Sequence, residues 1–228
     1  LGPDGEELLG WEIDANSLPM SLENIHTDCD DDIDTFAGFQ FTNGTSLILF
    51  FPPTGGCRLL ARRGGSISKS LRDTLPYKIH CVPTLGPVEK DERLIEKATV
   101  LRNLETHRAS RHFRNYWHHF PDGFDDFAAL LASTWPGMTV TMPKLVLLAS
   151  GSGGSPEPRL VMWCNEHRLA RELYGSGFGF QVWCQILTHV SSAITNGERL
   201  IVLDEPETYL HPELQRQLIA ILRSQNFD

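Results

Sequence analysis

Short β-like segments separated by turn residues fill the first part of the chain, up to about Arg63. The stretch FAGFQFTNGTSLILFF at residues 36–51 places Asn43 and Gly44 between two apolar runs. An Asn-Gly pair in that position is the strongest short hairpin signal, because both residues tolerate the positive φ that a tight turn needs. The pattern therefore predicts an antiparallel β unit.

The pattern becomes helical from Val88 to Phe120, where apolar side chains recur every three or four residues. They are Leu94, Ile95, Ala98, Leu101 and Leu104, followed by Phe113, Tyr116, Trp117 and Phe120. We interpret this stretch as a helical insert with a break near Thr106. A second amphipathic helix is predicted from Phe124 to Trp135, ended by Pro136 and Gly137.

The last part of the chain alternates strands and helices. Strands are predicted over 140–148 and 159–164, joined by a Gly/Ser-rich connection, and a helix over 181–194. Its apolar stripe consists of Trp183, Leu187, Val190 and Ile194, and Asn196 with Gly197 is predicted to end the helix. The aliphatic run Leu200 to Leu203 is typical of a strand buried on both faces of a parallel sheet, and a new helix begins at Pro212.

This order of elements predicts an α/β fold, with a core sheet, an antiparallel β unit and a helical insert. We divide the chain into a β-rich part over residues 1–86, the helical insert over 87–137, and the core over 138–228. All three are expected to form a single domain.

Composition narrows the classes of function. The 228 residues are 41% hydrophobic and 21% charged, which is ordinary for a folded protein, and the net charge of −9 argues against a surface coated for nucleic acid. One local exception is a segment with Arg102, Arg108, Arg111 and Arg114 between aromatic residues. It suits a phosphate contact, but we favour a helix whose arginines cover its solvated face and pair with acids.

Cysteine usage and hydropathy indicate the compartment. Five widely scattered cysteines contain no C-x-x-C pair, which is typical of reduced thiols, and no apolar run is long enough to cross a bilayer. The start of the chain also lacks the pattern of a signal peptide. We therefore expect a soluble, cytoplasmic protein with no membrane partner.

The acidic stretch Asp28 to Asp34 resembles the opening of a calcium loop. It has Ile33 where the tight-turn glycine belongs and Phe39 where the closing glutamate belongs. A solvated acidic loop is the better interpretation.

The pair Asp204 and Glu205 carries the candidate chemistry. Ligands of open α/β sheets sit beyond the carboxyl ends of the strands, which is where these two residues follow Leu203. Two adjacent carboxylates there can divide labour, one holding Mg²⁺ and the other accepting a proton from an attacking water. A polar turn that simply ends a strand is the alternative.

Two longer strings resemble one family. LDEPETYLHPELQRQL at residues 203–218 resembles the Walker B region of ABC-type ATPase heads, found in AAA-family ATPases related to OLD nucleases and to SMC and RecF-like proteins. YGSGFGFQVWCQILTHV at 174–190 is similar to their signature motif. The resemblance implies a P-loop NTPase fold of the ABC/SMC-head type, ATP and Mg²⁺ as cofactors, and a homodimer around the nucleotides.

The same resemblance implies the site residues. Asp204 corresponds to the metal ligand and Glu205 to the catalytic base, and the implied nucleotide contacts are Ser176, Gly177, Gly179 and Gln181. Gln181 follows Ser176 by five residues rather than the usual three, which loosens the match. Glu207 and His211 also match family positions, although for His211 a capping or packing role is at least as well supported.

A phosphate-binding loop of the form G-x-x-x-x-G-K-[ST] does not occur in the sequence. The nearest string, RGGSISKS, has Arg63 and Ser68 at the two glycine positions, so it is rejected. We interpret the sequence as the middle and later part of a longer ATPase head. The alternative is a truncated or degenerate module that binds a nucleotide or partner without hydrolysis and contacts nucleic acid through the arginine segment.

Overall fold

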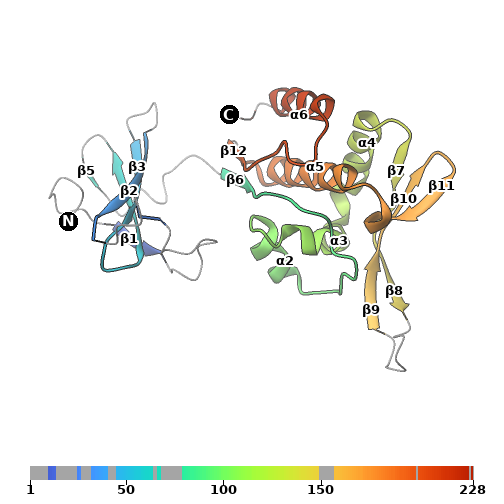
Figure 1. Ribbon diagram of the computed structural model, residues 1–228, viewed down its shortest axis with the longest axis horizontal. Coiled ribbons are helices and arrows are strands. Elements are labelled where there is room, and N and C mark those ends of the chain that lie inside the picture. The colour runs from blue at the N-terminus through green and yellow to red at the C-terminus, as the bar shows by residue number, and fades with distance from the viewer. Residues whose placement is uncertain are drawn as a thin grey trace. The chain divides into compact units, whose positions relative to one another are not determined.

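The protein divides into two compact units, residues 1–76 and 77–228. The computed structural model in Figure 1 describes residues 10–13, 25–26, 32–40, 45–63, 66–67, 79–148, 157–198, 200–225 and 227. The strand that follows residue 76 pairs with a strand near the end of the chain, so it belongs to the second unit.

The first unit is an antiparallel sheet in the order β1-β4-β3-β2, with β5 beside β4. Its strands are β1 (Gly10–Ile13), β2 (Thr35–Gln40), β3 (Thr45–Phe51), β4 (Cys57–Arg63) and β5 (Ser66–Ile67). The predicted β unit is confirmed, with Thr35 opposite Phe51 and Gln40 opposite Ser46. The Asn43-Gly44 turn lies outside the described residues, as does most of the acidic stretch 28–34.

The string RGGSISKS begins in this sheet. Arg63 at the end of β4 pairs with Ser66 at the start of β5, and these two strands are antiparallel. A phosphate loop instead connects a strand to a helix, which supports its rejection.

The described part of the second unit packs helices against three small groups of strands. Its helices are α2 (Lys97–Leu104), α3 (Phe113–His119), α4 (Phe124–Thr134), α5 (Phe178–Asn196) and α6 (Pro212–Ser224), with short 3-10 turns at Ala109–His112, Pro121–Gly123 and Leu173–Gly175. Its strands are β6 (Ile79–Val82), β7 (Met138–Val140), β8 (Lys144–Leu148), β9 (Glu157–Val161), β10 (Trp163–Glu166), β11 (Leu169–Glu172) and β12 (Leu200–Leu203). The pairs are β8–β9, β11–β10–β7 and β12–β6.

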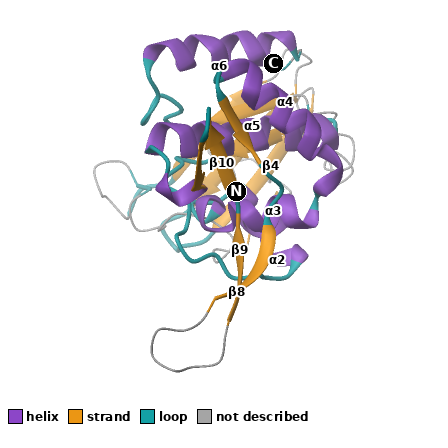
Figure 2. Ribbon diagram, turned by 90° about the vertical axis from the view of Figure 1, so that its right-hand side faces the viewer, coloured by secondary structure: helices purple, strands orange, loops and turns teal. Residues whose placement is uncertain are grey.

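Helix α5 is the centre of this unit. It lies between α6 on one side and α2 and α3 on the other (Figures 1 and 2). Every residue from Phe180 to Val190 is buried, whereas Ile194 at the end of the predicted stripe is 46% exposed. The predicted apolar stripe includes too few of the buried residues of α5, because a helix that is enclosed by other elements buries all of its faces. Gly197, at φ 67°, ends the helix as predicted.

The helical insert differs from its prediction at the start. Residues 83–96 form a non-helical segment with a turn at Lys90 and Asp91, and the first helix begins at Lys97, although the break near Thr106 is confirmed. The carboxylate of Glu92 explains the difference, because it accepts hydrogen bonds from the backbone N–H groups of Arg114 and Asn115. These are the unpaired donors in the first turn of α3, so Glu92 caps that helix from a distance.

The predicted parallel strand is confirmed at Leu200–Leu203, paired with β6 from Leu200–Ile79 to Leu203–Val82. The expectation that it is buried on both faces is wrong, since Val202 is 48% exposed. Within the described residues, β12 pairs with β6 alone, so one edge and part of one face stay open.

Candidate functional site

The predicted carboxylate pair stands at the carboxyl ends of β6 and β12. The N–H of Asp204 donates to the carbonyl of Val82 at 2.9 Å, which extends the strand pairing by one residue. The hydroxyl of Thr84 donates to Oδ2 of Asp204 at 2.7 Å. Thr84 therefore orients the Asp204 side chain. Both Asp204 and Glu205 are exposed to solvent.

The backbone after Asp204 turns sharply. Glu205 has φ 47° and Tyr209 has φ 66°, a region that costs a residue other than glycine about 1–3 kcal/mol. Thr208 N–H donates to the Glu205 carbonyl at 3.1 Å, and buried Leu210 donates to the Glu207 carbonyl at 2.9 Å. These contacts hold the strained loop in place.

A shallow pocket lies against the carboxylate pair. One wall is apolar and comes from residues after β6 and from α5; the other comes from the loop after β12. It is lined by Val82, Pro83, Leu85, Val182, Ile186, Asp204, Glu205, Pro206 and Thr208. The carboxylates therefore border a concave surface rather than a flat one.

The glycine-rich segment before α5 meets the same loop. A Cβ on Gly179 would lie 2.8 Å from the carbonyl oxygen of Tyr209, so only glycine allows this close approach. The rings of Phe178 and Tyr209 pack edge to face with centroids 6.0 Å apart. The two strings that carry the family resemblance are thus brought together in the fold.

The predicted nucleotide contacts are not equally accessible. Gly177 is exposed at the N-cap of α5 and leaves that helix without a side-chain cap. Ser176 is buried and its hydroxyl donates to the Leu173 carbonyl at 2.6 Å. Gln181 is fully buried, accepting from Val88 N–H and donating to the carbonyls of Tyr174 and Ser176. Gln181 therefore links the glycine-rich segment to the non-helical segment at residues 83–96 through hydrogen bonds.

A buried ionic cluster supports that segment. Arg114 is fully buried, and its guanidinium donates to Glu92 at 3.1 Å and to Glu172 at 2.7 and 2.9 Å. Glu172 also accepts from the N–H of Tyr174 at 2.7 Å, which caps the 3-10 turn ahead of Ser176. The cluster consequently joins the helical insert to the start of the glycine-rich segment.

Burial raises the pKa of the Glu92 carboxyl group, while the Arg114 charge and the hydrogen bonds from Asn115 and Arg114 pull this pKa back down. The interpretation of Arg114 as part of a solvated face is wrong. It points inward because two carboxylates and the Glu89 carbonyl are available there. Arg102, Arg108 and Arg111 are exposed as expected.

His211 caps a helix, which was the structural alternative to a role in the functional site. Its Nδ1 accepts from Glu213 N–H at 3.3 Å at the start of α6, with Pro212 as the first helical residue.

A model of the family described as "AAA domain, putative AbiEii toxin, Type IV TA system" matches residues 107–227, more than half of the chain. The chain belongs to this family. The predicted fold class, a P-loop ATPase head of the AAA and ABC type, is confirmed by this membership, and both motif strings lie within the matched residues.

Among solved structures, this AAA domain is similar to the "SmcHead bound to the C-winged helix domain of ScpA", with a TM-score of 0.49 and 12% identity. That match covers 85% of this chain and 63% of the other, so the chain spans less than two thirds of the solved head. A search of curated proteins finds no match.

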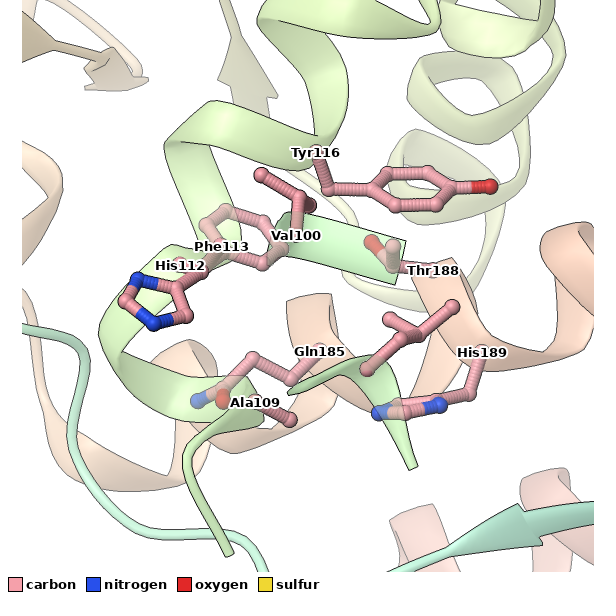
Figure 3. Close-up of a pocket in the computed structure, with 9 residues that line it drawn as sticks. Val100, Ala109, His112, Phe113, Tyr116, Gln185, Thr188 and His189 are labelled. Atoms are coloured by element: carbon pink, nitrogen blue, oxygen red, sulfur yellow. The ribbon is translucent and has the colours of Figure 1, made fainter. Parts of the chain in front are cut away.

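The described residues of the AAA domain also carry features that sequence reasoning missed. A second pocket lies between the helical insert and α5, lined by Val100, Leu104, Ala109, His112, Phe113, Tyr116, Gln185, Thr188 and His189 (Figure 3). Burial lowers the pKa of His112 there. Thr84, Glu172 and His80 were missed as well, because their partners lie far away in sequence and no local pattern marks them.

The described helices are each too short or too polar to cross a lipid bilayer. Among the described residues, Cys57, Cys81, Cys164 and Cys184 are free cysteines.

Proposed function

We propose that the protein belongs to an ATPase that hydrolyses ATP with Mg²⁺, in which Asp204 helps to hold the metal and Glu205 is the catalytic base. The observation that carries the proposal is the exposed carboxylate pair at the ends of two parallel strands, beside a pocket and a glycine-rich helix start. Membership of an AAA-domain family gives the reaction class.

Carboxylate oxygens suit Mg²⁺, which commonly takes one or two protein carboxylates together with water and phosphate oxygens. Bound there, the metal would supply charge neutralisation at the phosphates. Thr84 donates to one oxygen of Asp204, so a second oxygen and its lone pairs stay available. The left-handed backbone at Glu205 turns the chain directly after Asp204. We assign metal binding to Asp204 and proton transfer to Glu205.

The glycine-rich segment is assigned to the nucleotide of a second subunit. Gly177 and the first turn of α5 offer backbone N–H groups and a positive helix end to a phosphate. In this arrangement Gly179 sets the spacing to the loop after β12, and Gln181 fixes the segment from within. A Ser176 contact with phosphate requires its hydroxyl to leave the Leu173 carbonyl. The working unit is accordingly a homodimer.

ATP turnover of the full-length protein tests the base. Glu205→Gln should lower turnover on the order of 10²-fold or more while ATP still binds, because the amide cannot accept the proton. Glu213→Gln, an exposed carboxyl group at the start of α6, is the matched control and should leave turnover within about twofold. Unchanged turnover in Glu205→Gln would mean that another group is the base.

A second candidate is a nucleotide- or partner-binding module without hydrolysis. The internal hydrogen bonds of Ser176 and Gln181 favour it, because both side chains are already occupied. Phosphate release by the full-length protein separates the two: Mg²⁺-dependent turnover of ATP supports the ATPase, and ATP or partner binding without turnover supports the module. Nucleic-acid contact through Arg102, Arg108 and Arg111 requires binding that weakens as salt rises.

A further inference from the structure

A cluster away from the carboxylate pair gathers one histidine and two glutamates from three elements. His80 on β6 is fully buried, Glu105 follows α2, and Glu198 follows α5. Nδ1 of His80 lies 2.7 Å from a carboxylate oxygen of Glu198 and 3.6 Å from one of Glu105. One nitrogen and two carboxylate oxygens all lie within 4.8 Å of one another, a spacing that a metal ion could bridge.

The short contact between His80 and Glu198 does not have hydrogen-bond geometry. Nδ1 of His80 and Oε2 of Glu198 are both buried, and neither has a hydrogen-bond partner within the described part of the chain. Two buried polar atoms so close together without a hydrogen bond are costly, unless a third group lies between them and binds both.

The other ring nitrogen of His80 has a partner that suits metal binding. Nε2 of His80 lies 3.0 Å from Nδ1 of His189, deep in the core. His189 is buried as well, and either ring can donate the proton of this hydrogen bond. A proton on Nε2 of His80 satisfies this contact and leaves the Nδ1 lone pair facing the two glutamates, as in metal-binding histidines.

The surroundings carry uncompensated negative charge. Glu105 accepts one hydrogen bond from the backbone N–H of Cys81 at 3.3 Å, which leaves its charge unpaired. In the described ranges, neither glutamate forms an ion pair with Lys or Arg, and the basic side chain that both contact is His80. Two carboxylates beside a buried histidine call for a cation.

We propose that His80, Glu105 and Glu198 bind a divalent zinc ion that joins β6 to the ends of α2 and α5. Imidazole nitrogen and carboxylate oxygen are both zinc ligands, and three protein ligands leave a fourth position for water. Ligand atoms at bonds of about 2.0–2.1 Å in a tetrahedron lie roughly 3.3 Å apart, between the two separations observed here. Mg²⁺ fits less well, because it prefers oxygen ligands in an octahedron.

This ion is separate from the proposed nucleotide site. His80 pairs in register with Ile201, whereas Asp204 follows the last pair of the two strands. The ion would stabilise the base of the parallel strands and has no part in hydrolysis, so the zinc proposal stands whether or not the protein turns over ATP.

Zinc binding to the full chain tests the proposal. Protein stripped with a chelator is titrated with Zn²⁺ against a competing dye, and thermal unfolding is followed with and without the ion. We expect one ion per chain and a melting temperature that rises with Zn²⁺ concentration. Glu105→Gln and Glu198→Gln should each weaken the affinity at least tenfold, and His189→Asn about 10–100-fold through the orientation of His80.

Asp204→Asn is the matched control, since it removes a carboxylate from the other site and should leave zinc affinity unchanged. Circular dichroism of each metal-free variant checks that it folds. The proposal is overturned if the wild-type chain binds no ion, or if the glutamate variants bind it as tightly as wild type, which would place the ion on other histidines or cysteines. Loss of binding in Asp204→Asn alone would move the ion to the carboxylate pair.

Discussion

Two clusters of this protein each combine one fully buried basic side chain with two glutamates, but their surroundings differ. The first combines Arg114 with Glu92 and Glu172, and the second combines His80 with Glu105 and Glu198. In the first cluster, each ion pair between Arg114 and a glutamate is also a hydrogen bond, and both carboxylates accept further hydrogen bonds from backbone N–H groups. In the second, the closest pair of atoms makes none. A basic side chain with two glutamates can therefore form a closed structural unit or a site that still accepts a ligand.

The closed cluster should be the more sensitive to mutation. Arg114→Met should lower the free energy of unfolding by about 3–5 kcal/mol, because it leaves Glu92 buried without its cation. Denaturant unfolding measures this change. Arg111→Met, three residues earlier and exposed, should stay within about 0.5 kcal/mol of wild type. Equal effects of the two variants would show that Arg114 is not the centre of a closed unit.

Glu172→Gln probes the same cluster from its partly exposed side. Glu172 accepts from Arg114 and from the N–H groups of Met162 and Tyr174, so losing its charge should cost about 1.5–3 kcal/mol of unfolding free energy. The glycine-rich segment should also loosen, visible as faster amide exchange around Gly177. A variant as stable and as protected as wild type would contradict the link between the cluster and that segment.

Glu198→Gln should have the smallest effect when metal is absent. In chelator, the expected loss of unfolding free energy is below about 1 kcal/mol, because Glu198 makes no hydrogen bond to His80 whose loss would be felt. Denaturant unfolding in parallel with Glu172→Gln gives the comparison directly. A loss as large as that of Glu172→Gln would make the second cluster a closed ion pair like the first.

The candidate site illustrates how far local sequence patterns extend. The strand before Asp204, the helix starting at Pro212, the cap at His211 and the end of α5 at Gly197 each depend on neighbouring residues, and all were predicted. The carboxylate pair was found for the same reason, since a strand end and two acids are adjacent in the chain.

The inward turn of Arg114, the full burial of Gln181 and the meeting of Gly179 with Tyr209 were not predictable in this way. Periodicity treats an arginine between aromatic residues as solvated, because it cannot see carboxylates that lie 22 and 58 positions away. The break in the insert could be predicted at Thr106, but the late start of its first helix at Lys97 could not. Glu92 lies before that helix because its carboxylate caps another helix, α3.

By itself, the sequence determined the class of the fold, the order of its main elements, the two acids that face solvent and the family resemblance, because short-range periodicity, turn chemistry and adjacent motifs encode them. The tertiary structure alone decided which polar residues are buried and which side chains they contact. Burial makes a charged group seek a partner at any sequence distance, so Arg114 met two glutamates and His80 met two more only once β6, α2 and α5 had packed together.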